Sequence, residues 1–147
     1  MDRQIQRLLN KKIAFVGSTD EGKPFVKAML VSWREGSNIF YFDSNNGSVR
    51  VAQWKKNPAA CVYFYGRPVY RGVMLTGTME IINDMETKKR HWKSSMKSIY
   101  KGGVTDPDYC ILKFTAISGR YYSMFKSEDF EISRQIFMCD SDRGTRK

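Results

Sequence analysis

The sequence predicts a mainly β protein, a small closed or half-closed antiparallel barrel with peripheral helices. Six stretches of apolar and aromatic residues have the length of strands, and tight turns rich in glycine join several of them. The glycines inside a later stretch, Gly72 and Gly77, indicate bulges or barrel corners. Only a few segments repeat their apolar residues at helical spacing.

The composition limits the class of protein. The chain has 147 residues, which suits one domain with a real core. Lys and Arg outnumber Asp and Glu by 25 to 15, and the net charge of +10 attracts anions or simply favours solubility. The three dispersed cysteines and one histidine form no zinc motif and fit reduced thiols. The sequence has no signal-peptide pattern and no membrane-length apolar run, so we expect a soluble cytoplasmic protein.

The first half of the chain predicts one helix and three strands. Residues 2–11 repeat apolar side chains at helical spacing, namely Ile5, Leu8 and Leu9. Strands are expected at 12–18, 24–33 and 38–43, and the turns at 20–23 and 34–37 make them an antiparallel meander. Both faces of the stretch 24–33 are largely apolar, which predicts a strand covered on both sides.

The second half alternates helices and strands. Ser48 is expected to cap a helix through Lys56, with Val51 and Trp54 facing inward. Strands follow at 59–65, 69–82 and 109–124. A helix from Asp84 to about Tyr100 is expected to turn its apolar residues to one face and to expose its basic residues and His91. The inward set is Met85, Trp92, Met96, Ile99 and Tyr100. The tail alternates weakly at Phe130, Ile132 and 136–138, and 143–147 is expected to fray.

Two features point to an anionic ligand. Lys27 lies in the middle of an apolar set, so its ammonium group either extends to solvent along its stem or faces an anion. Residues 45–50, Asn-Asn-Gly-Ser-Val-Arg, combine a turn, a hydroxyl, a helix start and an arginine, which together make a candidate phosphate site. Hydrolytic and metal chemistry lack the necessary residues, which leaves a bound cofactor that carries its own reactivity.

Four segments in order carry a family resemblance: 25–31, 39–42, 48–58 and 70–80. Over residues 5–125 the sequence resembles the pyridoxamine 5′-phosphate oxidase-related flavin-binding split barrels, most closely the general stress protein 26-like branch. The resemblance implies a six-stranded antiparallel split barrel with a Greek key. It also implies a homodimer with two flavin mononucleotide (FMN) sites at the subunit interface. We expect one domain over 1–147, with a C-terminal extension at 126–147.

The resemblance also implies roles for individual residues. Lys27, Ser48 and Arg50 would hold the cofactor phosphate. The flavin ring would lie against residues of two neighbouring strands, Met29, Leu30, Val31, Ser32, Tyr41 and Phe42. Arg71 and Gly72 match a segment that the partner subunit contributes, and Tyr122 stands where relatives place an aromatic residue near the flavin.

The chain also departs from the oxidases proper, which have Lys where this chain has Ser32 and Gln where it has Gly72. Their C-terminal substrate arm is not evident here, so pyridoxamine 5′-phosphate is not expected as a substrate, and whether the protein is an FMN-dependent oxidoreductase stays open. Two alternatives remain. One is a nucleic-acid-binding barrel using the aromatic runs 40–42 and 63–65, although such residues more often form the core. The other is the same barrel binding heme or a deazaflavin. A homodimer is also expected from four large apolar residues, Trp33, Trp54, Val73 and Leu75.

Overall fold

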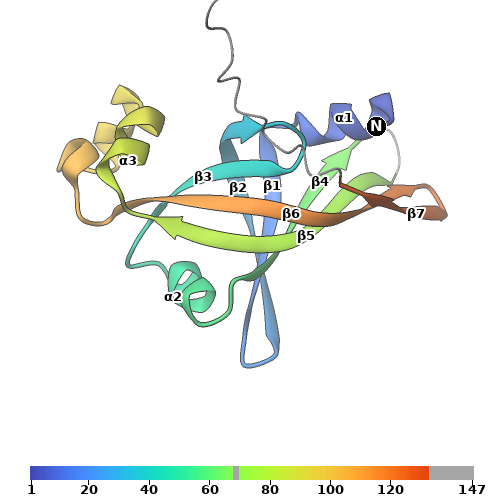
Figure 1. Ribbon diagram of the computed structural model, residues 1–147, viewed down its shortest axis with the longest axis horizontal. Coiled ribbons are helices and arrows are strands. Elements are labelled where there is room, and N and C mark those ends of the chain that lie inside the picture. Colours follow the sequence, from blue (N-terminus) through green and yellow to red (C-terminus); the bar gives the residue numbers. More distant parts are fainter. Residues whose placement is uncertain (68–69, 133–147) are drawn as a thin grey trace, which may run out of the picture.

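The strands close into a barrel (Figure 1). The computed structural model describes residues 1–67 and 70–132, and the strands in this part form one antiparallel sheet in the order β3-β2-β1-β4-β5-β6-β7. Because β3 also pairs with β6, the first six strands form a closed ring, as predicted, and β7 adds to β6 outside it. The strands are β1 (Ile13–Asp20), β2 (Lys23–Glu35), β3 (Ile39–Asn45), β4 (Ala59–Gly66), β5 (Arg71–Ile82), β6 (Tyr109–Ser123) and β7 (Lys126–Glu131).

The ring has Greek-key order. Strands β1, β2 and β3 follow one another as hairpins, and β4 returns to pair with β1 on the side away from β2. The connection from β3 to β4 carries α2 (Val49–Lys56), and Ser48 caps this helix as predicted, since its Oγ accepts a hydrogen bond from the Val51 amide. Helix α1 (Arg3–Leu9) confirms the N-terminal prediction and buries Ile5, Leu8 and Leu9.

The β1–β2 hairpin extends below the barrel as an arm (Figure 1). Glu21 and Gly22 both have positive φ, 49° and 78°, which is the signature of a two-residue type I′ turn. The prediction that β2 is covered on both faces is wrong for the single chain. Val26 is 73% exposed and Leu30 is 57% exposed, because before Val31 the strand pairs with β1 alone.

The predicted bulge at Gly77 is present. Thr76 pairs with Ser118 but Gly77 pairs with Ala116, so Ile117 is an extra residue in β6. A Cβ atom at position 77 would lie 1.9 Å from the Thr115 carbonyl oxygen, which explains the glycine. Gly72 pairs regularly on both sides instead, and the Tyr63 hydroxyl occupies the place of its missing side chain.

The second predicted helix is shorter than expected. Helix α3 (Met85–His91) begins at the Asp84 cap but ends at His91, and Trp92 and Lys93 are extended before two short 3₁₀ turns, η1 (Ser94–Ser98) and η2 (Gly103–Thr105). The break lets Trp92 and Tyr100 pack against Tyr109 of β6, with ring centroids 5.2 and 4.9 Å away. This long-range packing outweighs the local helical pattern.

Several side chains of this segment lie opposite to their predicted sides. Met85 and Ile99, expected to face inward, are exposed. His91 and Lys88, expected on a solvated face, are buried, and the Lys88 ammonium lies 5.7 Å from the centre of the Tyr109 ring. The chain therefore uses part of its basic face for packing against β3 and β6.

The core fills the ring of strands. Its fully buried side chains include aromatic and branched residues of β1, β3, β4, β5 and β6, namely Val16, Phe40, Phe42, Val62, Phe64, Val73, Leu75, Leu112 and Phe114. Trp54 of α2 and Leu8 of α1 belong to the same cluster. None of the helices in the described part is long and apolar enough to cross a membrane.

The predictions for the C-terminal part of the chain are only partly covered by the described residues. The predicted strand 109–124 is β6, and the part of the extension from Lys126 to Glu131 forms β7. The weak pattern at 136–138, the expected fraying at 143–147, Cys139 and the first residue of the predicted strand 69–82 lie outside the described residues.

Candidate functional site

A cavity opens where β2 and β3 separate. The two strands pair only from Val31 to Glu35 and from Ile39 to Phe42, and the gap beyond is covered by α2 and by the segment after α3. We call this space the β2–β3 cavity. Its volume is about 440 Å³, within the range of small-molecule sites. It is lined by Lys27, Ala28, Met29, Leu30, Asp43, Ser44, Asn45, Arg50, Lys93, Ser95, Met96, Ile99 and Tyr100.

One wall of the β2–β3 cavity is a strand edge. Residues 27–30 pair with β1 on one side, and no described strand pairs with them on the other. Every second residue of such an edge directs its N–H and C=O groups away from its only partner. The edge therefore offers a row of backbone donors and acceptors to a planar ligand.

Arg50 supplies a cation that lacks an acceptor. It lies in the first turn of α2 and lines the cavity, and its Nε atom is buried without a hydrogen-bond partner in the described part of the chain. Leaving such a donor unpaired is costly, and the cost is larger for a charged group. The geometry therefore points to an acceptor on a ligand. Ser48 is nearby, but its Oγ already accepts the Val51 amide hydrogen.

Asp43 and Lys93 line the same cavity and were missed by the sequence reasoning. Tyr109 donates its hydroxyl hydrogen to Asp43 Oδ1 at 3.1 Å. Burial raises the pKa of Asp43, and the Tyr109 hydrogen bond and the Lys93 charge oppose this shift. Lys93 lines the cavity because the helix ends at His91 instead of continuing as predicted. The only local sequence signal of this helix end was the pair Ser94 and Ser95.

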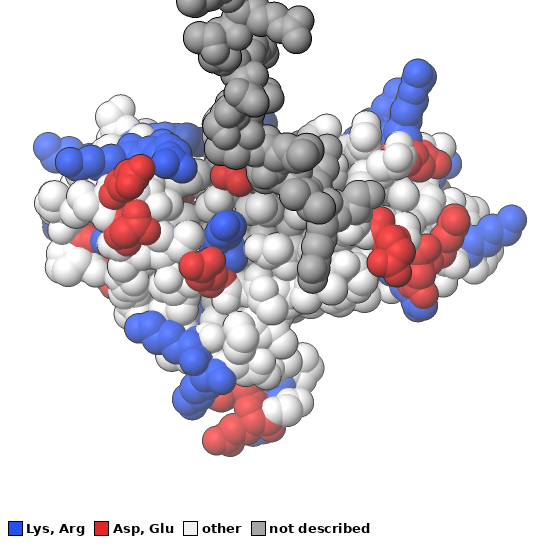
Figure 2. All heavy atoms as spheres, in the orientation of Figure 1, with Lys and Arg blue, Asp and Glu red and all other residues white. Residues whose placement is uncertain are grey.

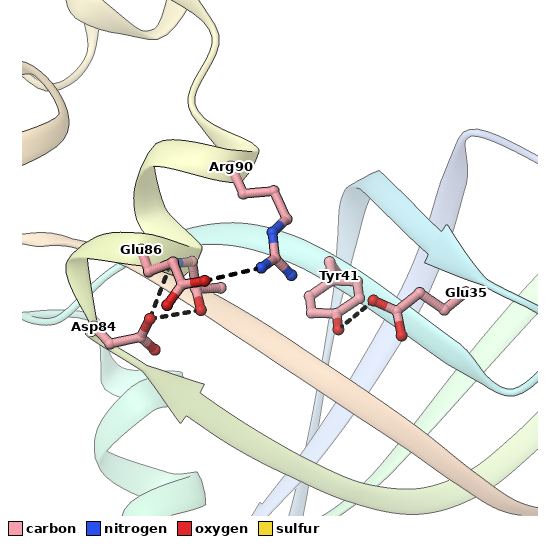
Figure 3. A network of polar contacts seen from close by, with 6 residues as sticks. Glu35, Tyr41, Asp84, Glu86 and Arg90 are labelled. Carbon is pink, nitrogen blue, oxygen red and sulfur yellow. Dashed lines mark hydrogen bonds and ion pairs between the residues drawn. The ribbon is translucent and has the colours of Figure 1, made fainter. Parts of the chain in front are cut away.

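The other predicted ring contacts, Val31, Ser32, Tyr41 and Phe42, do not line the β2–β3 cavity. Val31 and Phe42 are buried in the core at the last β2–β3 pair. Ser32 donates its Oγ hydrogen to the Tyr41 carbonyl at 3.0 Å, and Tyr41 donates its own hydroxyl to Glu35 at 2.9 Å (Figure 3). Burial, followed by the Glu35 hydrogen bond, raises the pKa of Tyr41 to about 12.

Arg71, Gly72 and Tyr122 form a second group outside the cavity. Gly72 pairs directly with Tyr122, and none of the three residues lines the β2–β3 cavity. Two strands, β1 and β4, lie between β2 and Gly72 of β5. A single chain therefore brings together Lys27, Met29, Leu30 and Arg50 but not this second group.

No group of three or more His, Cys, Asp or Glu side chains able to hold a metal ion occurs in residues 1–67 and 70–132. The free cysteines there are Cys61 and Cys110, and burial raises the pKa of the Cys110 thiol to about 11. This part of the chain therefore offers neither a metal cluster nor an activated thiol.

Comparison with known proteins gives one family. Residues 1–138 match the family described as pyridoxamine 5′-phosphate oxidase like. A crystal structure of a protein related to general stress protein 26 of Bacillus subtilis, of the pyridoxinephosphate oxidase family, from Clostridium acetobutylicum is 35% identical; the match covers 90% of this chain and 97% of that one, with a TM-score of 0.77. General stress protein 26 from Bacillus anthracis is 17% identical, with coverage of 88% and 96% and a TM-score of 0.70.

A heme binding protein from Mycobacterium smegmatis shares the fold at 12% identity, with a TM-score of 0.66 and coverage of 86% of this chain and 56% of that one. Among proteins with curated functions, none matches the sequence significantly.

Proposed function

This chain belongs to the pyridoxamine 5′-phosphate oxidase-like family, whose members typically bind a flavin, and on that premise we propose that it binds FMN in the β2–β3 cavity. The observation that carries the proposal is Arg50, which lines the cavity and whose buried Nε atom has no hydrogen-bond acceptor among the described residues. A phosphate group supplies that acceptor.

The residues fit the phosphate end of FMN. Lys27 and Arg50 line one cavity from β2 and α2, and Arg50 stands in the first turn of an eight-residue helix whose N-terminus attracts anions. Ser48 contributes by holding that helix end in place, since its Oγ is engaged with the Val51 amide. Two cations and a helix terminus match a group that carries about two negative charges.

The residues also fit the ring end. The unpaired edge of β2 offers backbone groups to the polar edge of a flavin, and Met29 and Leu30 add apolar contacts. FMN, when bound, supplies reversible one- and two-electron redox chemistry, so the protein would be a flavin-dependent redox protein. Asp43, whose pKa is raised, is the cavity residue best suited to hold a proton.

We further propose a homodimer that completes the site. Arg71, Gly72 and Tyr122 do not line the cavity of their own chain, and the family resemblance implies that a partner chain would bring them to it. Of the four residues that predicted a dimer, only Trp33 is exposed, whereas Trp54, Val73 and Leu75 are in the core. Other exposed apolar residues lie on β1, β2 and β4 and are candidates for this interface, namely Ile13, Phe15, Val26, Leu30 and Tyr65.

Burial of aromatic residues weakens the nucleic-acid alternative. The nucleic-acid alternative loses four of its six stacking residues, because Phe40, Phe42 and Phe64 are fully buried and Tyr41 is buried. Tyr63 is half-buried and Tyr65 is exposed. Reduced thiols at Cys61 and Cys110 support the cytoplasm as the location.

An absorbance spectrum of the purified protein, followed by titration with FMN, tests the proposal. We expect two visible flavin bands or saturable FMN binding at one site per chain. A Soret band would establish heme instead, and the absence of binding to FMN would refute the proposal.

A further inference from the structure

A second cavity lies beside α1 and gathers positive charge. Its volume is about 210 Å³, and it is formed by the last turn of α1 and the facing ends of β4 and β5. We call it the basic cavity. It is lined by Gln4, Arg7, Leu8, Lys11, Gly66, Arg67 and Arg71. Four of these seven residues are cations and none is an acid.

Close packing of α1 brings the charges together. A Cβ atom at Gly66 would lie 2.3 Å from Leu8 Cδ2, so the glycine lets the helix rest on the end of β4. This places Arg7 and Lys11 of the helical segment beside Arg67 and Arg71 of the strands. Like charges in one concave space repel one another, and a bound anion would relieve that repulsion.

The usual partners of such cations are missing or already used. In residues 1–67 and 70–132 none of the four forms an ion pair. Basic residues at a helix C-terminus commonly interact with its free carbonyls. Here Arg34 does so, because its guanidinium donates to the Leu9 carbonyl at 3.0 Å and to the Lys11 carbonyl. The four cations of the cavity are therefore left without this partner.

Gln4 adds an oriented neutral donor. Tyr121 donates its hydroxyl hydrogen to Gln4 Oε1 at 2.8 Å, which leaves the Gln4 amino group available at the rim of the cavity. Figure 2 shows Lys and Arg side chains at both ends of one face of the molecule and on the arm below it.

We propose that the basic cavity binds the diphosphate group of a small molecule. Three arginines suit phosphate oxygens because each guanidinium can donate two parallel hydrogen bonds. A monophosphate carries about −1.5 to −2 at neutral pH, whereas four cations match the larger charge of a diphosphate. The volume holds such a group but not a whole nucleotide, so the rest of the ligand extends outside. This site is separate from the β2–β3 cavity of its own chain, but its Arg71 is also the residue assigned above to the flavin of a partner chain. The two assignments of Arg71 compete, and titration in the presence of FMN decides between them.

Calorimetric titration with inorganic pyrophosphate, at about 0.15 M salt, tests the proposal. The test variant is Arg7→Gln with Lys11→Gln, and the control is Lys89→Gln with Lys97→Gln, two exposed lysines outside the basic cavity. Both variants lower the net charge equally. We expect saturable binding by the wild type and the control, and affinity reduced by roughly ten-fold or more in the test variant. Equal losses in both variants, or no saturable binding by the wild type, would overturn the proposal.

Thermal unfolding of each variant verifies that it is folded. Two further measurements test whether the basic cavity belongs instead to the cofactor site or to a nucleic-acid surface. Pyrophosphate is titrated again after saturation with FMN, and we expect unchanged affinity; if FMN abolishes binding, the four cations belong to the cofactor site. A short single-stranded oligonucleotide forms the last arm. If it binds and pyrophosphate does not displace it, the surface recognises a nucleic-acid backbone and the proposal is wrong. Failure of FMN binding alone would leave the pyrophosphate result standing.

Discussion

The imidazole of His91 lies against the phenol ring of Tyr41, with ring centroids 4.6 Å apart, and the Trp33 ring meets it edge-on at 6.4 Å. Through these aromatic contacts the end of α3 packs against β2 and β3. Arg90, the residue before the histidine, extends from α3 toward Tyr41 (Figure 3). His91 is only 8% exposed, although the sequence pattern predicted a surface position.

Acid should destabilise the protein through His91. Burial lowers its pKa below 6.5, Arg90 and Lys93 lower it further, and Glu35 opposes them. The unfolded chain therefore binds the proton first, so the contribution is complete above about pH 6.5 and is lost as the pH falls toward the lower folded-state value. Urea unfolding at pH 7.5 and 5.5 is expected to show a smaller loss of stability for His91→Phe than for wild type. Parallel losses in the two proteins would show that other groups dominate.

Lys88 should matter for stability more than its neighbour Lys89. Its side chain is buried and its ammonium lies over the Tyr109 ring, whereas Lys89 is exposed. Lys88→Ala should lower the free energy of unfolding by about 1–2 kcal/mol, through the lost cation–π contact and the lost packing of the stem. Lys89→Ala should change it by less than about 0.5 kcal/mol. Denaturant unfolding measures both, and Lys88→Met separates packing from charge. Equal values for the two alanine variants would contradict the structural assignment.

Local sequence signals predicted most of the fold. Gly22 marks a turn that needs a positive φ, and Gly77 marks a bulge that leaves no room for a Cβ atom. Ser48 caps α2 through a hydrogen bond from the amide three residues later. The end of α3 was missed because its cause is distant. Trp92 docks on Tyr109, seventeen positions later, and no helical periodicity encodes that contact.

Only those residues of the candidate site that local sequence signals place could be predicted. Lys27 and Arg50 meet in one cavity as their positions in a strand and a helix start suggested. Asp43 was not foreseen, because the separation of β2 from β3 that exposes it depends on where their pairing stops. Gly72 and Tyr122 lie together at the other end of β5, and their connection with the cavity depends on a second chain that the sequence does not place.

Phe15→Glu should weaken the proposed dimer. Phe15 faces outward from β1 beside Tyr63 of β4 and is one of the candidate interface residues. A buried carboxylate without a partner costs several kcal/mol, so the variant should be monomeric at micromolar concentration while the wild type is a dimer. Light scattering measures the mass. Val49→Glu is the control, since Val49 is also exposed (70%, against 40% for Phe15) but lies on α2, where a glutamate suits the helix start. A monomeric wild type, or dissociation of both variants, would refute this assignment of the interface.

Arg50→Ala should weaken FMN binding far more than riboflavin binding. The buried Nε atom of Arg50 lacks an acceptor, and the phosphate of FMN would provide one that riboflavin does not have. A hydrogen bond to a charged group contributes about 1.5–3 kcal/mol, so affinity for FMN should fall roughly ten- to a hundred-fold. Fluorescence quenching measures both ligands, and Lys55→Ala, an exposed change at the other end of α2, is the matched control. If both ligands lose affinity equally, Arg50 supports the fold of the cavity. If neither changes, the phosphate is held elsewhere and Arg50 has another acceptor.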